Sequence, residues 1–149
     1  MVKRSENFDF AVAILLFILA MLGCDRGPTL VPASGIVKYK NAPIPGADVV
    51  LVPEGDGQPA IGRTDDRGEF SLVTSGRKGA LVGSYKVSIT AARPKHEVSP
   101  AEAVAMSSEQ IAANREDLIP VKYNNPVSSE LAVTVTRDPA ANKFVFDLK

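Results

Sequence analysis

The sequence contains a single cysteine, Cys24, and its position suggests a specific chemistry for the thiol. Cys24 follows an uncharged apolar run over residues 10–22, and Lys3 and Arg4 supply positive charge before that run. As a helix the run would span about 20 Å, which is short of the roughly 30 Å of a bilayer core. A basic start, a short apolar run and small residues at its end are typical of a secretory signal peptide.

The residues around the cysteine, Met21-Leu22-Gly23-Cys24, resemble the lipobox of bacterial lipoproteins. The resemblance implies a signal peptide over 1–23, cleavage before Cys24 and diacylglyceryl attachment to its thiol. Two or three acyl chains would anchor the chain stably in a bilayer. We therefore expect a protein anchored by the lipid at Cys24 in the cell membrane or outer membrane, facing the periplasm or the exterior. Secretion without lipid and an uncleaved anchor helix are the alternatives.

Charge and composition exclude several classes of function. Lys and Arg total 17 and Asp and Glu total 17, so the chain lacks the basic surplus of a nucleic-acid binder. One Cys and one His exclude an intramolecular disulfide, a multi-thiolate metal site and a two-histidine site within one chain. Hydrophobic residues make up 45% of the sequence, which is enough for a packed core.

Beyond a short Pro- and Gly-containing tether over 24–33, the sequence alternates short apolar-patterned runs with turn residues. This pattern predicts an all-β domain over 34–149, with seven mostly antiparallel strands. The seven expected strands are Gly35–Lys40, Ala47–Pro53, Ala60–Thr64, Glu69–Thr74, Tyr85–Ala91, Glu130–Thr136 and Lys143–Leu148.

One segment breaks this rhythm. Ser99-Pro100-Ala101-Glu102 is typical of a helix start, with Ser99 as the N-cap and Glu102 completing a capping box. We expect a short helical insertion over about 99–113. Its apolar stripe is thin, so we expect it to cover a sheet edge or to lie loosely on the surface.

Four motifs between Ser34 and Thr90 resemble the carboxypeptidase regulatory-like (transthyretin-like) family. They are Gly35-Ile36-Val37, Asn41-Ala42-Pro43-Ile44-Pro45-Gly46-Ala47, Thr64-Asp65-Asp66-Arg67-Gly68-Glu69-Phe70 and Gly83-Ser84-Tyr85-Lys86-Val87. The resemblance implies an immunoglobulin-like, prealbumin-type β-sandwich. The physical roles of these motifs are structural: Asp65 would accept a turn amide, Gly68 would adopt positive φ, and Pro43 and Gly46 would shape a turn.

No constellation of residues predicts catalysis, a cofactor or a metal. His96 is a lone histidine without a nucleophile or a second ligand at recognisable spacing. Lys38 and Asn142 occupy places reminiscent of the isopeptide pairs of collagen-adhesin domains, but no acid is clearly placed to catalyse that bond. Four loop carboxylates lack a calcium-loop pattern and are expected to be solvated turn residues: Glu54, Asp56, Asp65 and Asp66.

One polar and aromatic cluster, Tyr123-Asn124-Asn125, could form a binding platform, because exposed aromatic rings stack on sugars. The sequence as a whole predicts a non-catalytic, lipid-anchored extracytoplasmic module. Its expected role is structural or protein-interacting at the cell envelope, with an unknown envelope protein or glycan as partner and no nucleic acid. The alternative is a carbohydrate- or cell-wall-binding module.

Overall fold

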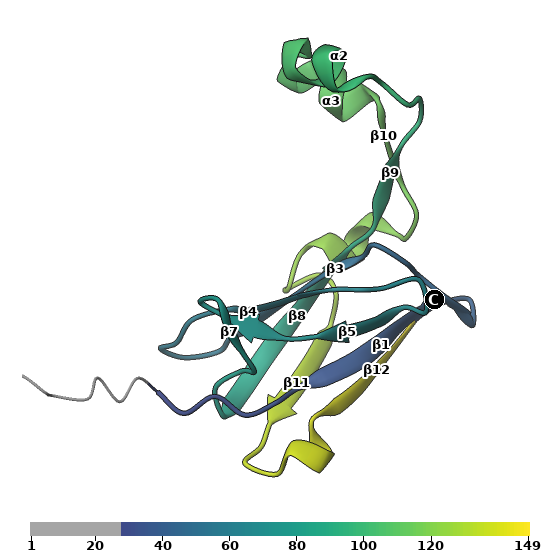
Figure 1. Ribbon diagram of the computed structural model, residues 1–149. Coiled ribbons are helices and arrows are strands. Elements are labelled where there is room, and N and C mark those ends of the chain that lie inside the picture. The colour runs from purple at the N-terminus through teal and green to yellow at the C-terminus, as the bar shows by residue number, and fades with distance from the viewer. Residues whose placement is uncertain (1–27) are drawn as a thin grey trace, which may run out of the picture.

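The computed structural model describes residues 28–149 (Figure 1). The predicted signal peptide, Cys24 and the first part of the tether lie outside these residues. The strands are β1 Ser34–Tyr39, β2 Ala42–Pro43, β3 Asp48–Pro53, β4 Ala60–Arg63, β5 Glu69–Ser71, β6 Val73–Thr74, β7 Arg77–Lys78, β8 Gly83–Thr90, β9 Ala92–Pro94, β10 Arg115–Asp117, β11 Leu131–Val135 and β12 Lys143–Leu148. The helices are α2 Pro100–Ala105 and α3 Ser108–Ala113, with 3₁₀ turns η1 Val121–Asn124 and η2 Pro139–Ala141.

The larger sheet has six strands in the order β11-β8-β3-β4-β6-β7, and its pairings are antiparallel. β3 lies in its middle, between β4 and β8. Alternate residues of β3, Val49 and Leu51, are fully buried, as are Val87 and Ile89 of β8. Because side chains alternate across a strand, these residues form one inward face. The predicted all-β class is confirmed.

The smaller sheet has the order β12-β1-β2, and β5 also pairs with β1. β1 and β12 run parallel, with Ser34 opposite Lys143 and Tyr39 opposite Leu148. This pair is the exception to the mostly antiparallel arrangement that the sequence predicts. Parallel neighbours need a long connection, and here the rest of the domain lies between the first strand and the last one.

The expected strand Glu69–Thr74 is also divided. Its first half is β5, which pairs with β1, whereas its second half is β6, which pairs with β4 in the other sheet. Leu72 lies at the crossing, is 1% exposed, and donates its N–H to Ala33 at 2.9 Å. The short strands β2, β7, β9 and β10 were not expected as strands, so the simple seven-strand count does not describe residues 28–149.

The two sheets share one apolar core. Val37, Phe146 and Leu148 of the smaller sheet join Val49, Leu51 and the other buried residues of the larger sheet in a single cluster. The rings of Phe70 and Phe146 stack with their centroids 6.0 Å apart, and Phe144 lies 6.4 Å from Phe146. The strongly alternating last strand thus supplies the aromatic side of the core.

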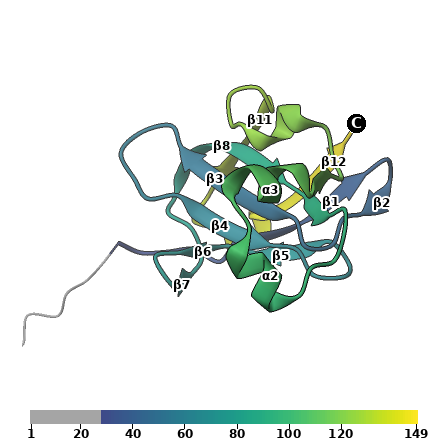
Figure 2. The same cartoon turned by 90° about the horizontal axis from the view of Figure 1, so that it is seen from above.

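The helical insertion forms an arm rather than a cover. β9 and β10 pair as a two-stranded ribbon, and Figure 1 shows this ribbon carrying both helices away from the sheets. Seen from above, the helices lie in front of the strand layers (Figure 2). The expected single helix is two helices, because Met106 and Ser107 both have extended backbone between them. Within residues 28–149, no helix has the length and apolar character needed to cross a membrane.

Candidate functional site

Two turns that the sequence singled out meet beside β1. Asp65 Oδ1 accepts the N–H groups of Arg67 and Glu69, each at 2.9 Å, and Gly68 has φ +73°. A Cβ atom on Gly68 would lie 2.7 Å from the carbonyl oxygen of Val37 and 3.0 Å from Cβ of Pro43. The two turns therefore pack against each other, and glycine is required both by the backbone angle and by this close approach.

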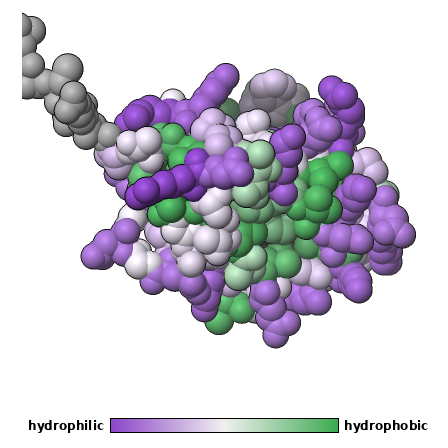
Figure 3. All heavy atoms as spheres, turned by 90° about the horizontal axis from the view of Figure 1, so that it is seen from below, coloured by the Kyte–Doolittle hydropathy of each residue, from purple (hydrophilic) through white to green (hydrophobic). Residues whose placement is uncertain are grey.

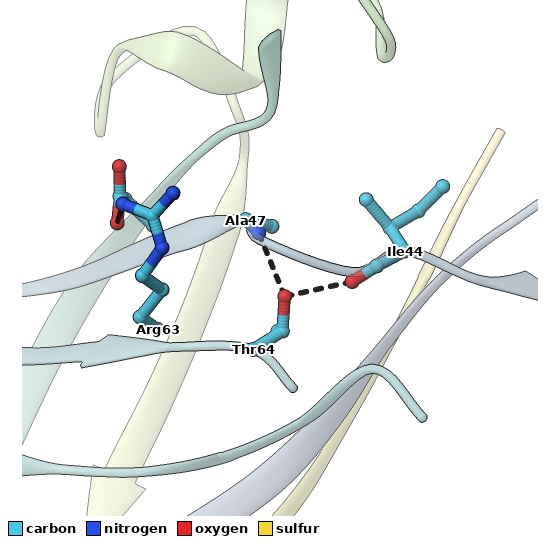
Figure 4. Close-up of polar contacts among 5 residues, drawn as sticks. Ile44, Ala47, Arg63 and Thr64 are labelled. Carbon is cyan, nitrogen blue, oxygen red and sulfur yellow. Dashed lines mark hydrogen bonds and ion pairs between the residues drawn. The ribbon is translucent and has the colours of Figure 1, made fainter. Parts of the chain in front are cut away.

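Thr64 connects the same region to the start of β3 (Figure 4). Its buried hydroxyl accepts the N–H of Ala47 at 2.7 Å and donates to the carbonyl of Ile44 at 2.7 Å. Gly46, between these two residues, has φ +67° and donates its N–H to the Thr64 carbonyl at 3.1 Å. The turn residues thus satisfy one another's polar groups, which is a structural role.

A salt bridge borders this region on its exposed side. Arg63 Nη1 lies 3.2 Å from Asp48 Oδ1, and the two side chains are 70% and 55% exposed. An ion pair this open to water contributes little to stability. Nothing in this pair resembles an acid–base arrangement held for catalysis.

The predicted binding platform at Tyr123 is corrected by the structure. Tyr123 is only 5% exposed, and its hydroxyl donates to the Lys149 carbonyl at 3.2 Å while accepting the Lys149 N–H at 3.1 Å. Asn125 Oδ1 accepts the N–H of Val127 at 2.8 Å, and Asn124 Oδ1 is buried without a partner. The hydroxyl of Tyr123 holds the residue that follows β12, and the ring is buried, so it is not open to stack on a sugar.

The isopeptide pair is not brought together. Lys38 lies opposite Asp147 in the β1–β12 register, five positions from Asn142, or about 16 Å along a strand. Asn142 is fully buried, and its Nδ2 donates to the carbonyls of Thr136 at 2.9 Å and Pro32 at 3.3 Å. Its amide therefore organises the loop before β12.

The remaining sequence candidates lie apart from one another. His96 is exposed in the loop between β9 and α2, where its N–H donates to Asn114 Oδ1 at 2.9 Å. Asn114 Nδ2 donates in return to the His96 carbonyl at 2.9 Å. In the described part of the chain, no group of three or more His, Cys, Asp or Glu side chains is arranged to hold a metal ion.

The arm contains a surface that the sequence did not identify. A groove of about 400 Å³ runs between the β9–β10 ribbon and the two helices. Its apolar lining comes from both the ribbon and the helices: Ala92, Pro94, Val98, Ala103, Met106 and Ile111. Ile111 is 56% exposed, and neither helix contains a buried residue. The sequence shows the thin apolar stripe of the insertion, but only the folded arm shows which ribbon residues lie opposite that stripe.

Local polar contacts hold this arm in shape. Both helices have complete capping boxes, from Ser99 with Glu102 and from Ser107 with Gln110. The hydrogen bond from the Ser99 side chain lowers the pKa of Glu102, and the bond from the Ser107 side chain lowers the pKa of Glu109. Both carboxylates are exposed and lie in the first turn of a helix, where a negative charge stabilises the helix start.

Two ion pairs reinforce the ribbon. Arg93 lies 2.8 Å from Glu116 across the two strands, and Arg115 lies 3.1 Å from Asp117 along one strand. The groove is lined by apolar side chains, and the positive and negative charges at its rim are paired with each other. Such a surface can bind aliphatic side chains.

Comparison of the chain with protein-family models, with curated proteins and with solved structures finds no match.

Proposed function

We propose that the protein is a lipid-anchored, non-catalytic module of the cell envelope that binds another protein through its helical arm. The lipobox-like residues ending at Cys24 support anchoring. The shared core of two sheets and the paired turns at Pro43 and Gly68 support a prealbumin-type, immunoglobulin-like sandwich of the carboxypeptidase regulatory-like class. Together these features describe a stable scaffold held at a membrane.

The aliphatic groove of the arm is the observation that carries the binding role. Folding normally covers apolar surface, yet the groove holds Val98 at 39% exposure and Ile111 at 56%. Exposed apolar patches with polar rims are typical of protein interaction sites. A protein segment that presents aliphatic side chains is the partner that this groove fits.

The direction of the arm favours a protein partner over the bilayer. The described chain begins at one side of the molecule, beside the sheets, whereas the arm rises above them (Figure 1). Val31 then fixes this segment by pairing with Ala80. With a lipid at Cys24 only a few residues earlier, the anchor would attach beside the sheets rather than at the arm.

The glycan-binding alternative finds no aromatic platform in residues 28–149. Tyr85 and Tyr123 are 2% and 5% exposed, and Tyr39 is half-buried in β1. The arm itself offers aliphatic side chains, which do not stack on sugar rings as aromatic ones do. Protein binding therefore accounts for more of the observed surface.

Site-specific photo-cross-linking in intact host cells tests this proposal. A photoreactive residue at Ile111 should give a discrete protein adduct, whereas one at Val127, another exposed aliphatic position at 72%, should not. The adduct should disappear when Ala103 in the groove is changed to Glu, because a buried unpaired carboxylate opposes apolar contact. No adduct at Ile111, or equal adducts at both positions, would reject binding through the arm. Glycan adducts at Ile111 would instead favour the alternative.

A further inference from the structure

β12 forms an edge of the smaller sheet, because its only strand partner among residues 28–149 is β1. The hydrogen bonds that flank the pairing fix which backbone groups face β1. Ser34 N–H donates to the Asn142 carbonyl at 3.0 Å, and Lys40 N–H donates to the Leu148 carbonyl at 3.2 Å. Backbone groups alternate in direction along a strand. The even-numbered residues of β12 therefore bond to β1, and Lys143, Val145 and Asp147 direct their N–H and C=O groups to the open edge.

The side chains of the same three residues lie on the outer face of the sheet. Lys143, Val145 and Asp147 are all exposed, and Val145 is 68% exposed at the centre of the strand. The opposite face carries Phe144, half-buried, and Phe146, 5% exposed. An open edge of six residues with an aliphatic centre is a template for pairing with another strand.

The order of charges along this edge identifies the occupant. We propose that β12 pairs antiparallel with β12 of a second copy of this chain, with Val145 on the twofold axis. Lys143 of each copy then lies opposite Asp147 of the other, and Val145 lies opposite its own equivalent. On the inner face, Phe144 pairs with Phe146. Opposite charges and aromatic pairs facing each other across antiparallel strands stabilise the pairing.

The backbone obeys the same symmetry. Residues that face each other in this register are both odd-numbered or both even-numbered. The outward N–H and C=O groups of Val145 therefore meet those of its equivalent in a hydrogen-bonded pair, and those of Lys143 meet those of Asp147. A one-residue shift would bring outward groups against inward ones and would separate the charges. Side chains and backbone thus specify one register, as a twofold interface requires.

No other strand edge in the described residues combines this length with this order of charges, and β5, β9 and β10 contain only three residues each. β2 and β7 contain two residues each, and β11, Leu131–Val135, carries no charge. Seen from the side opposite the arm, apolar side chains gather within a hydrophilic margin (Figure 3). Val133 of β11 and Phe144 of β12 are both only half-buried, so the edge strands leave apolar surface open on both sheets. Pairing at β12 would reduce the exposure of Phe144.

Charge reversal tests the pairing in the full-length chain in density-matched detergent, with the association state measured by sedimentation equilibrium. Lys143→Glu alone, or Asp147→Lys alone, places like charges opposite each other twice per dimer and should raise the dimer dissociation constant about tenfold or more. An equimolar mixture of the two variants should recover dimers, because every facing pair then has opposite signs. Lys86→Glu, an exposed reversal on β8, which is paired on both sides, should leave association unchanged.

A disulfide measurement checks the register. In a hydrogen-bonded antiparallel pair the Cα atoms lie about 5.5 Å apart, which is within bridging range. Val145→Cys should therefore form a cross-linked dimer on mild oxidation, whereas Val127→Cys, at a position 72% exposed, should not. Wild-type protein, which retains Cys24, controls for that thiol. A monomeric wild type, a dimer indifferent to both reversals, or no recovery in the mixture would overturn the proposal.

Discussion

Gly35 determines at the scale of one residue how the aromatic side of the core packs. A Cβ atom built at Gly35 would collide with the carbonyl oxygen of Phe144 and would lie 2.8 Å from the ring of Phe70. Phe70 in turn stacks on Phe146. The first residue of the Gly35-Ile36-Val37 motif must therefore be glycine, because the Phe144 carbonyl oxygen and the Phe70 ring lie against it.

We predict that Gly35→Ala destabilises the fold by about 1–3 kcal/mol, because the added methyl group forces the ring and the backbone apart. Urea unfolding followed by circular dichroism measures the change. Gly55→Ala is the matched control, since nothing lies within 4 Å of its Cβ position. Both substitutions restrict the unfolded chain alike, so their difference reports the native collision. Equal stability of the two variants would contradict this account of Gly35.

The turn at Asp65 was predictable from sequence, whereas the position of Tyr123 was not. Asp65, Gly68 and their bonded amides lie within five consecutive residues, so their geometry is local. Tyr123 bonds to Lys149, 26 positions away, and its turn η1 packs against β8. A residue pattern carries local geometry directly, but it does not show which distant segment will cover a ring.

The helical arm behaves, at the scale of elements, as two short helices stabilised mainly by their caps. Helices of six residues are too short to be stable in isolation. Their capping boxes and the β9–β10 ribbon supply the missing stabilisation. The Ser99 cap was predicted from sequence, but the break at Met106–Ser107 was not, because both residues occur in helices as well as in caps.

We predict that acid loosens the arm before it unfolds the sheets. The capping bonds lower the pKa of Glu102 and of Glu109 below 4.5. A carboxylate with a lowered folded-state pKa stabilises the fold above its ordinary pKa, and the effect is lost as pH falls through the lowered value. Cα chemical shifts of residues 100–113 should therefore move toward coil values as the pH falls below the ordinary pKa of a glutamate, while those of β3 and β8 stay constant.

The double variant Glu102→Gln and Glu109→Gln serves as the control for this prediction. Glutamine retains an oxygen that can accept the capping hydrogen bonds but does not titrate in this range. Its helical shifts should therefore be independent of pH. If wild type and variant respond to acid in the same way, the caps are not the titrating elements.

Anchoring and orientation belong to the scale of the whole molecule. The predicted lipid site, Cys24, precedes the described domain by a short tether. The arm leaves a different side of the domain from the one at which the described chain begins (Figure 1). This arrangement would keep the arm groove accessible while the edge of β12 remains free for a second copy.

We predict that protein extracted from its native membrane has a mature chain beginning at Cys24 and carrying diacylglycerol mass. Intact-mass spectrometry measures this directly. Cys24→Ser removes the acceptor thiol and should yield no lipid adduct. A chain that still begins at Met1 without added mass would identify residues 10–22 as an uncleaved anchor. A cleaved, unmodified chain would instead indicate simple secretion.

The sequence by itself determined the features that depend on neighbouring residues. Val49 and Leu51 share one face of a strand, and so do Phe144 and Phe146. The capping box at Ser99 and the tight turn at Asp65 are the other local features. Each follows from side-chain periodicity or from hydrogen bonds that span only a few positions. Such patterns establish the all-β class before any contact between distant segments is known.

Only the tertiary structure decided which segments meet. The parallel pairing of β1 with β12, the crossing at Leu72 and the burial of Tyr123 join residues far apart in the chain. The apolar groove of the arm and the open edge of β12 emerge in the same way. Long-range contacts form because many apolar surfaces compete to be covered, and that competition is settled by the packing of the whole core rather than by any single stretch of sequence.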